Sequence, residues 1–110
     1  MSEKKLEMSV LCDVYGELLG EKQREALELY YNEDLSLSEI AENTGISRQG
    51  VRGQIKYAEA QLTEYESKLG LSEKYRFLAG KLAEIAASEK VKNDKGLMAI
   101  IDEIQTEFNI

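Results

Sequence analysis

Residues 35–58, LSLSEIAENTGISRQGVRGQIKYA, contain the pattern that decides the fold. Ser36 and Glu39 form an S-x-x-E capping box, which marks the first turn of a helix. Ser47 can cap a second helix that follows closely. Between the two, Gly45 can adopt the left-handed conformation that ends a helix and begins a tight turn. This spacing of caps and turn predicts a helix-turn-helix.

Apolar residues beside the caps support the same prediction. Leu35 and Ile40 occupy the hydrophobic staple positions of the first helix. Ile46 and Val51 occupy those of the second, and Ala41 supplies the small residue that crossing helices need where they touch. Helix-turn-helix motifs also serve as packing units or protein-docking modules, so the motif alone does not assign a ligand.

The composition of the 110-residue chain favours an all-α protein. Proline is absent, and no stretch alternates apolar and polar residues as a strand would. There is no His, and the single cysteine, Cys12, cannot form an internal disulfide, which fits a reducing cytoplasm. No apolar run is long enough for a signal peptide or a membrane span. We therefore expect a cytoplasmic protein without membrane insertion, and Cys12 as a small core residue.

Amphipathic patterns predict helices on both sides of the turn. Apolar residues every three or four positions predict helices over residues 3–19 and 21–31. The second motif helix should span residues 47–69 and stop at the glycine that follows, because its heptad-like apolar seam continues that far. Of the adjacent Tyr30 and Tyr31, we expect one in the core and the other half-buried over it.

The remaining residues are expected to form a helical extension. Ser72 should cap a helix, the polar residues 88–95 should form a loop, and residues 97–108 should form the last helix.

The chain thus divides into a helix-turn-helix domain, residues 1–62, and a C-terminal helical extension, residues 63–110. The amphipathic helices have more apolar surface than a short motif can cover. We therefore expect a homodimer whose contact surface begins at Leu62 and ends at Phe108.

The start and outer face of the second motif helix contain the candidate nucleic-acid contacts. If this helix enters a major groove, five side chains would reach nucleic acid: Ser47, Arg48, Gln49, Arg52 and Lys56. Arg48 and Arg52 lie one turn apart, and Gln49 offers the donor and acceptor pair that suits adenine. Residues 47–58 contain three positive charges and no acid. The same pattern fits the solvated face of an amphipathic helix, so both interpretations stay open.

Three features argue against a self-sufficient DNA binder. The net charge is -7, whereas DNA binders gain much of their affinity from cations that release counterions. The acids Glu39 and Glu42 precede the candidate helix and would repel phosphate. Gly50 and Gly53 each cost the helix about 1 kcal/mol relative to Ala, and Gly53 has no side chain with which to read a base.

No pattern indicates an enzyme. The chain lacks His and a glycine-rich phosphate loop, so nucleophiles and bases have no partners. Two acidic pairs, Glu64 with Glu66 and Asp102 with Glu103, fit solvated helix faces better than metal ligands. We expect no catalytic residue, no metal, no cofactor and no small-molecule substrate.

The residues resemble the YlxM family of small bacterial helix-turn-helix proteins over about residues 6–71. The resemblance rests on Gln23-Arg24, residues 27–31 and 36–41, Ser47-Arg48-Gln49, Val51, Ile55, Glu59, Leu62 and residues 65–69. Residues 21–62 are also similar to the fourth region of sigma factors, whose helix-turn-helix reads a promoter element. The chain departs from the family at Gly53 and Tyr57, where relatives often have Asp and Arg.

The resemblance implies a regulatory role in or around the signal recognition particle pathway, because the family's gene usually lies beside that of the particle's GTPase. Components of the particle are therefore candidate partners. Two other functions stay open: a dimeric, sequence-specific transcriptional regulator, and a sigma-like adaptor that docks on RNA polymerase or another protein. DNA and RNA both remain candidate ligands.

Overall fold

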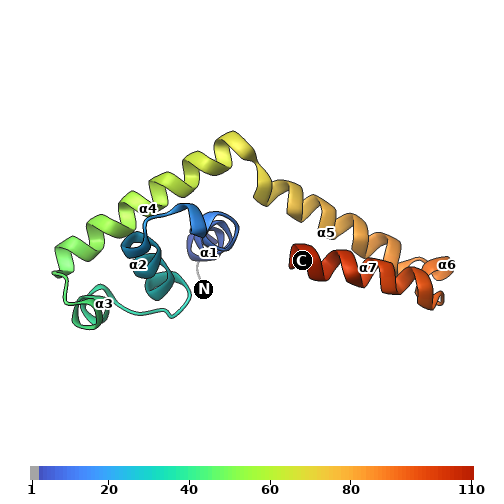
Figure 1. Ribbon diagram of the computed structural model, residues 1–110, viewed down its shortest axis with the longest axis horizontal. Helices are drawn as coiled ribbons and strands as arrows, with labels where there is room; N and C mark the ends of the chain where they lie inside the picture. The colour runs from blue at the N-terminus through green and yellow to red at the C-terminus, as the bar shows by residue number, and fades with distance from the viewer. Residues whose placement is uncertain (1–2) are drawn as a thin grey trace. The chain divides into compact units, whose positions relative to one another are not determined.

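The computed structural model describes residues 3–110, and within them all regular secondary structure is helical, which confirms the all-α prediction (Figure 1). The chain divides into two compact units, Met1–Gly70 and Leu71–Ile110. The first unit contains α1 (Glu3–Tyr15), the 3-10 helix η1 (Gly16–Leu18), α2 (Glu21–Tyr31), α3 (Leu37–Thr44) and α4 (Arg48–Leu69). The second contains α5 (Leu71–Ala87), α6 (Glu89–Lys92) and α7 (Lys95–Phe108).

The capping devices of the helix-turn-helix form as predicted. The Ser36 hydroxyl accepts a hydrogen bond from the Glu39 backbone N–H, and the Glu39 carboxylate accepts one from the Ser36 N–H, both at 3.1 Å. Gly45 ends α3 in the left-handed conformation, with φ of +75°. Ser47 then caps α4 by accepting a hydrogen bond from the Gly50 N–H at 3.0 Å. These local bonds fix the turn between α3 and α4.

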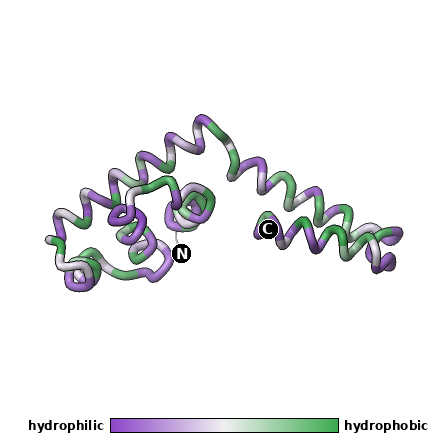
Figure 2. Tube along the Cα trace, in the orientation of Figure 1, coloured by the Kyte–Doolittle hydropathy of each residue, from purple (hydrophilic) through white to green (hydrophobic). Residues whose placement is uncertain are grey.

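The long helix α4 is the centre of the first unit. Hydrophobic residues recur along it (Figure 2), and the buried ones are Val51, Ile55, Ala58 and Leu62. They pack with α1, α2 and α3, which all contact α4. α4 continues to Leu69 and ends at Gly70, whose φ is +60°, as predicted. The first unit therefore extends to Gly70, beyond the boundary expected after residue 62.

Cys12 and Tyr31 are core residues. The Cys12 side chain is buried, as predicted, and this burial raises the pKa of its thiol to about 11, with further contributions from Glu28 and Asp13. Of the two adjacent tyrosines, Tyr31 is buried, and the half-exposed Tyr30 packs edge-on against it at 4.9 Å between ring centroids. This arrangement also matches the prediction.

The ends of three elements differ from the sequence prediction. The first helix ends at Tyr15, and the chain continues in a 3-10 turn from the buried Gly16. Ser72 does not precede its helix as predicted, because α5 already starts at Leu71 and Ser72 is a buried residue of its first turn. Residues 88–95 are not simply a loop, since they contain the short helix α6 and the first residue of α7. Asp94 causes the early start of α7 by accepting hydrogen bonds from the N–H groups of residues 96 and 97.

The second unit is a helical hairpin with a small core. Tyr75, near the start of α5, contacts Phe108, at the end of α7, with ring centroids 5.9 Å apart, so the two helices are antiparallel. The buried apolar residues of this unit are Leu82 and Ile101. Five large apolar side chains stay exposed on it: Phe77, Ile85, Leu97, Ile100 and Phe108.

Candidate nucleic-acid interface

The exposed face at the start of α4 brings four of the five predicted contact residues together. Arg48, Gln49, Arg52 and Lys56 line an open hollow of about 520 Å³ with Gly53 and with Leu37 of α3. Ser47 does not line this hollow, because its hydroxyl caps the helix. The opposite side of α4 is buried in the core, so packing directs these polar side chains to solvent.

The three cations of this face have no acidic partner among residues 3–110. Neither Arg48, Arg52 nor Lys56 forms an ion pair there within 4.0 Å, although the chain has a net charge of -7. They are spaced four residues apart and therefore follow one side of the helix. Such a row of unpaired cations is suited to contact phosphate groups.

Glu39 and Glu42, the acids that we expected to repel phosphate, do not line the hollow on α4. Glu39 uses its carboxylate in the capping box. Glu39 and Glu42 line a separate hollow on α3 with Leu35 and Asn43. The lining of the hollow on α4 therefore contains no acidic residue.

A second hollow of about 400 Å³ extends this face toward α1 and α2. It shares Leu37, Arg52 and Lys56 with the first hollow, so the two are contiguous. Its remaining lining residues are Lys4, Lys5, Tyr30, Tyr31, Ile55 and Glu59. Sequence reasoning missed Lys4 and Lys5, because only the packing of α1 on α4 brings them near the motif. Two consecutive lysines in an acidic chain were the feature of the sequence that could have indicated these contact residues.

The two added lysines are partly neutralised. The Lys5 ammonium donates a hydrogen bond to Asp34 at 2.7 Å and lies 5.1 Å from the centroid of the Tyr30 ring. This hydrogen bond raises the pKa of Lys5 and lowers the pKa of Asp34. Lys4 lies 3.7 Å from the Glu59 carboxylate. The unpaired cations on α4 therefore provide most of the free positive charge.

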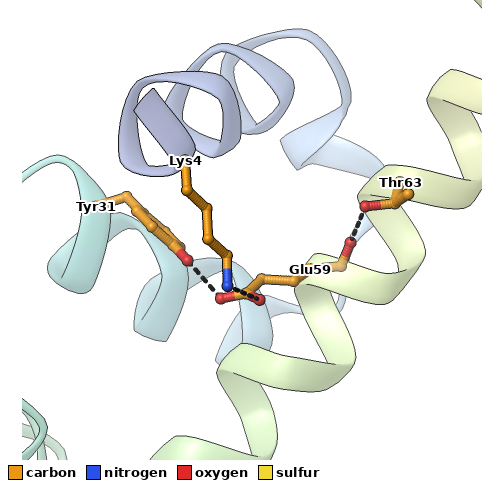
Figure 3. Close-up of polar contacts among 4 residues, drawn as sticks. All are labelled: Lys4, Tyr31, Glu59 and Thr63. Atoms are coloured by element: carbon orange, nitrogen blue, oxygen red, sulfur yellow. Dashed lines mark hydrogen bonds and ion pairs between the residues drawn. The ribbon is translucent and has the colours of Figure 1, made fainter. Parts of the chain in front are cut away.

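Glu59 connects three helices beside this face (Figure 3). Its carboxylate accepts a hydrogen bond from the Tyr31 hydroxyl of α2 at 2.5 Å and contacts Lys4 of α1. Thr63 donates a hydrogen bond to the Glu59 carbonyl at 2.9 Å. Burial, together with the Glu59 carboxylate, raises the pKa of Tyr31 above its ordinary value, so its hydroxyl stays a donor.

We predict that Glu59→Ala lowers the free energy of unfolding by about 1–3 kcal/mol, because the buried Tyr31 hydroxyl loses its partner. Urea denaturation at neutral pH measures this change. Glu64→Ala is the matched control on α4, since Glu64 is exposed and pairs only with Lys68 one turn away. Equal losses in the two variants would contradict a specific role for Glu59.

The described part of the chain shows neither a metal-binding cluster nor a membrane span. Residues 3–110 contain no group of three or more His, Cys, Asp or Glu side chains that could hold a metal ion. None of the helices there is both long and apolar enough to cross a membrane.

Comparison with known proteins gives a family match over nearly the whole chain. Residues 2–104 match the model of the family UPF0122, described as "Putative helix-turn-helix protein, YlxM / p13 like". The UPF0122 protein of Clostridium kluyveri is 43% identical over 107 residues, which is 97% of this chain and 86% of that protein. The relative from Thermoanaerobacter sp. (strain X514) is 41% identical over 112 residues, covering 98% and 96%. The relative from Halalkalibacterium halodurans is 43% identical over 107 residues, covering 96% and 98%.

Proposed function

Since this chain belongs to the UPF0122 family of YlxM/p13-like helix-turn-helix proteins, we propose that it is a regulatory protein that binds nucleic acid. The proposed contact surface is the exposed face of α4, with Ser47 at its edge and with Arg48, Gln49, Arg52 and Lys56 across it. The observation that supports it most is the row of three unpaired cations in an acidic chain. Unpaired cations repel one another, and phosphate groups would offset that cost.

The charge of this face sets the expected strength of binding. Three phosphate contacts would give a salt dependence with a logarithmic slope of about -3, which is small beside that of strong repressors. The remaining acidic surface weakens long-range attraction further. We therefore propose a protein that acts on an RNA or ribonucleoprotein together with other components, rather than an autonomous repressor.

The proposed setting is the signal recognition particle pathway. Support for it comes from the resemblance to the YlxM family and the usual place of the family's gene beside that of the particle's GTPase. The particle contains an RNA, which would provide phosphates for the face on α4. This setting agrees with the acidic charge better than promoter binding does.

Arg52→Glu is expected to weaken nucleic-acid binding at least about tenfold and to reduce the logarithmic salt slope by about 1. Arg52 lines both hollows, so a reversed charge there affects the whole face. Fluorescence anisotropy with the RNA of the particle and with duplex DNA measures the change. Arg76→Glu, an exposed substitution on α5, is the charge-matched control. Unchanged binding by Arg52→Glu would exclude this face.

The two alternative functions give different partners in a pull-down from lysate. A partner lost after ribonuclease treatment supports the ribonucleoprotein setting. Recovery of specific DNA fragments would instead support a transcriptional regulator whose half-sites lie about one helical turn apart. A protein partner retained after nuclease treatment would support the sigma-like adaptor.

We also propose that the second unit mediates homodimerisation. Units of about 40 residues rarely fold without disulfides, metals or oligomerisation, and this unit buries only Leu82 and Ile101 among its large apolar side chains. Leu62 cannot contribute to the contact as expected from the sequence, because it is fully buried in the first unit. The exposed side chains of α5 and α7 would form the contact instead.

Ile100→Glu is therefore expected to convert a dimer into a monomer, because it puts a charge at the centre of the apolar surface of α7. Sedimentation equilibrium at micromolar concentration should give twice the chain mass of 12.4 kDa for the unmodified protein. Thr106→Glu, on an exposed part of α7, should remain dimeric. A monomer mass for the unmodified chain would contradict the proposal.

A further inference from the structure

α4 contains two glycines, Gly50 and Gly53, and packing explains only one of them. A Cβ atom on Gly50 would lie 2.8 Å from Ile46 Cγ2 and 3.1 Å from the Ser47 hydroxyl, so any larger residue there would have to displace these side chains. A Cβ atom on Gly53 would meet nothing within 4 Å. Glycine destabilises a helix interior, and no contact within the first unit compensates for that cost at Gly53.

Gly53 leaves bare backbone in the first hollow. The surrounding side chains are Arg48, Gln49, Arg52 and Lys56 of α4 and Leu37 of α3. This hollow is open to solvent, and its volume of about 520 Å³ leaves room for a group of the size of a nucleotide base. The cations at the edge of the hollow can contact phosphate groups. The amide of Gln49 can form hydrogen bonds with the edge of a base, and the apolar side chain of Leu37 can contact the face of the base.

An exposed aromatic side chain, Tyr57, follows the lining residues of this hollow along α4. Tyr57 follows Gly53 by one helical turn, so both lie on the same side of α4. Tyr57 is 58% exposed, and its hydroxyl accepts a hydrogen bond from the Gln61 amide at 3.4 Å. Exposed aromatic rings beside cations are typical of proteins that stack unpaired bases.

We propose that the hollow at Gly53 binds an unpaired nucleotide. Its base would lie against the Gly53 backbone and Leu37 or stack on Tyr57, and the flanking phosphates would contact Arg48, Arg52 and Lys56. A base within a duplex exposes only its edges and cannot enter such a hollow. Stacking also provides affinity that does not depend on positive charge, which suits an acidic chain. This inference rests on the proposed function and specifies its ligand.

The test compares the binding of the full chain to three probes. They are an RNA hairpin with a loop of about six nucleotides, a single-stranded DNA with the loop sequence, and the RNA stem as a blunt duplex. Gly53→Leu fills the hollow, whereas Gly80→Leu adds the same side chain at a glycine of α5 that also has nothing within 4 Å. Both substitutions favour a helix, so thermal melting should show that both variants fold.

We expect the unmodified chain to bind the hairpin more tightly than the duplex. Gly53→Leu and Tyr57→Ala should each weaken hairpin binding about tenfold, and Gly80→Leu should leave it unchanged. Equal affinity for the hairpin and the single-stranded DNA would indicate that contacts with the base and the phosphates are sufficient for binding. Preference for the hairpin would indicate an added contribution from the ribose, the stem or the ordered loop; either result supports the hollow as the site when Gly53→Leu weakens the binding.

Two results would overturn this inference. Binding of the duplex by the unmodified chain as tightly as the hairpin would refute the nucleotide site and leave the proposed function intact. Hairpin binding that is equally strong in Gly53→Leu and the unmodified chain would do the same. Failure of the unmodified chain to bind any probe or the RNA of the particle would refute the proposed function itself.

Discussion

The burial of one side of α4 determines the arrangement of the candidate site. Val51, Ile55, Ala58 and Leu62 pack into the first unit, and burial of each of the three larger side chains, those of Val51, Ile55 and Leu62, contributes about 1.5–3 kcal/mol. Because a helix is rigid, fixing this side directs the opposite side to solvent. The row of cations and the bare backbone at Gly53 are thereby held in place. Without this packing, α4 would not be held against the other helices of the first unit, and its contact residues would lose their fixed positions.

Local bonds and tertiary packing have separate roles around the turn. The capping box of α3 and the Ser47 cap of α4 define where the helices begin, and Gly45 sets the angle between them. Glu59 connects α4 to Tyr31 and Lys4, beside the second hollow. The acids nearest the cations are thus occupied by caps and by polar contacts. This distribution explains how an acidic chain presents a locally basic face.

The elements that depend on local sequence were predictable, and those that depend on distant packing were not. The motif caps, Gly45 and Gly70 rely on neighbouring residues, and the structure agrees with the sequence at each. Ser72 had the sequence of a cap but lies buried within the first turn of α5, which already begins at Leu71. Arg52 and Lys56 could be selected from helical spacing alone. Lys4 and Lys5 could not, since only the packing of α1 on α4 brings them to the same face.

The most direct test of the account is an NMR titration of the isotope-labelled full chain with the RNA hairpin. If the exposed face of α4 is the contact surface, backbone amide shifts should change most between Arg48 and Tyr57, with smaller changes at Lys4 and Lys5. The amides of α7 should not respond. Changes confined to the second unit, or absent at saturating RNA, would contradict the assignment of nucleic-acid binding to α4.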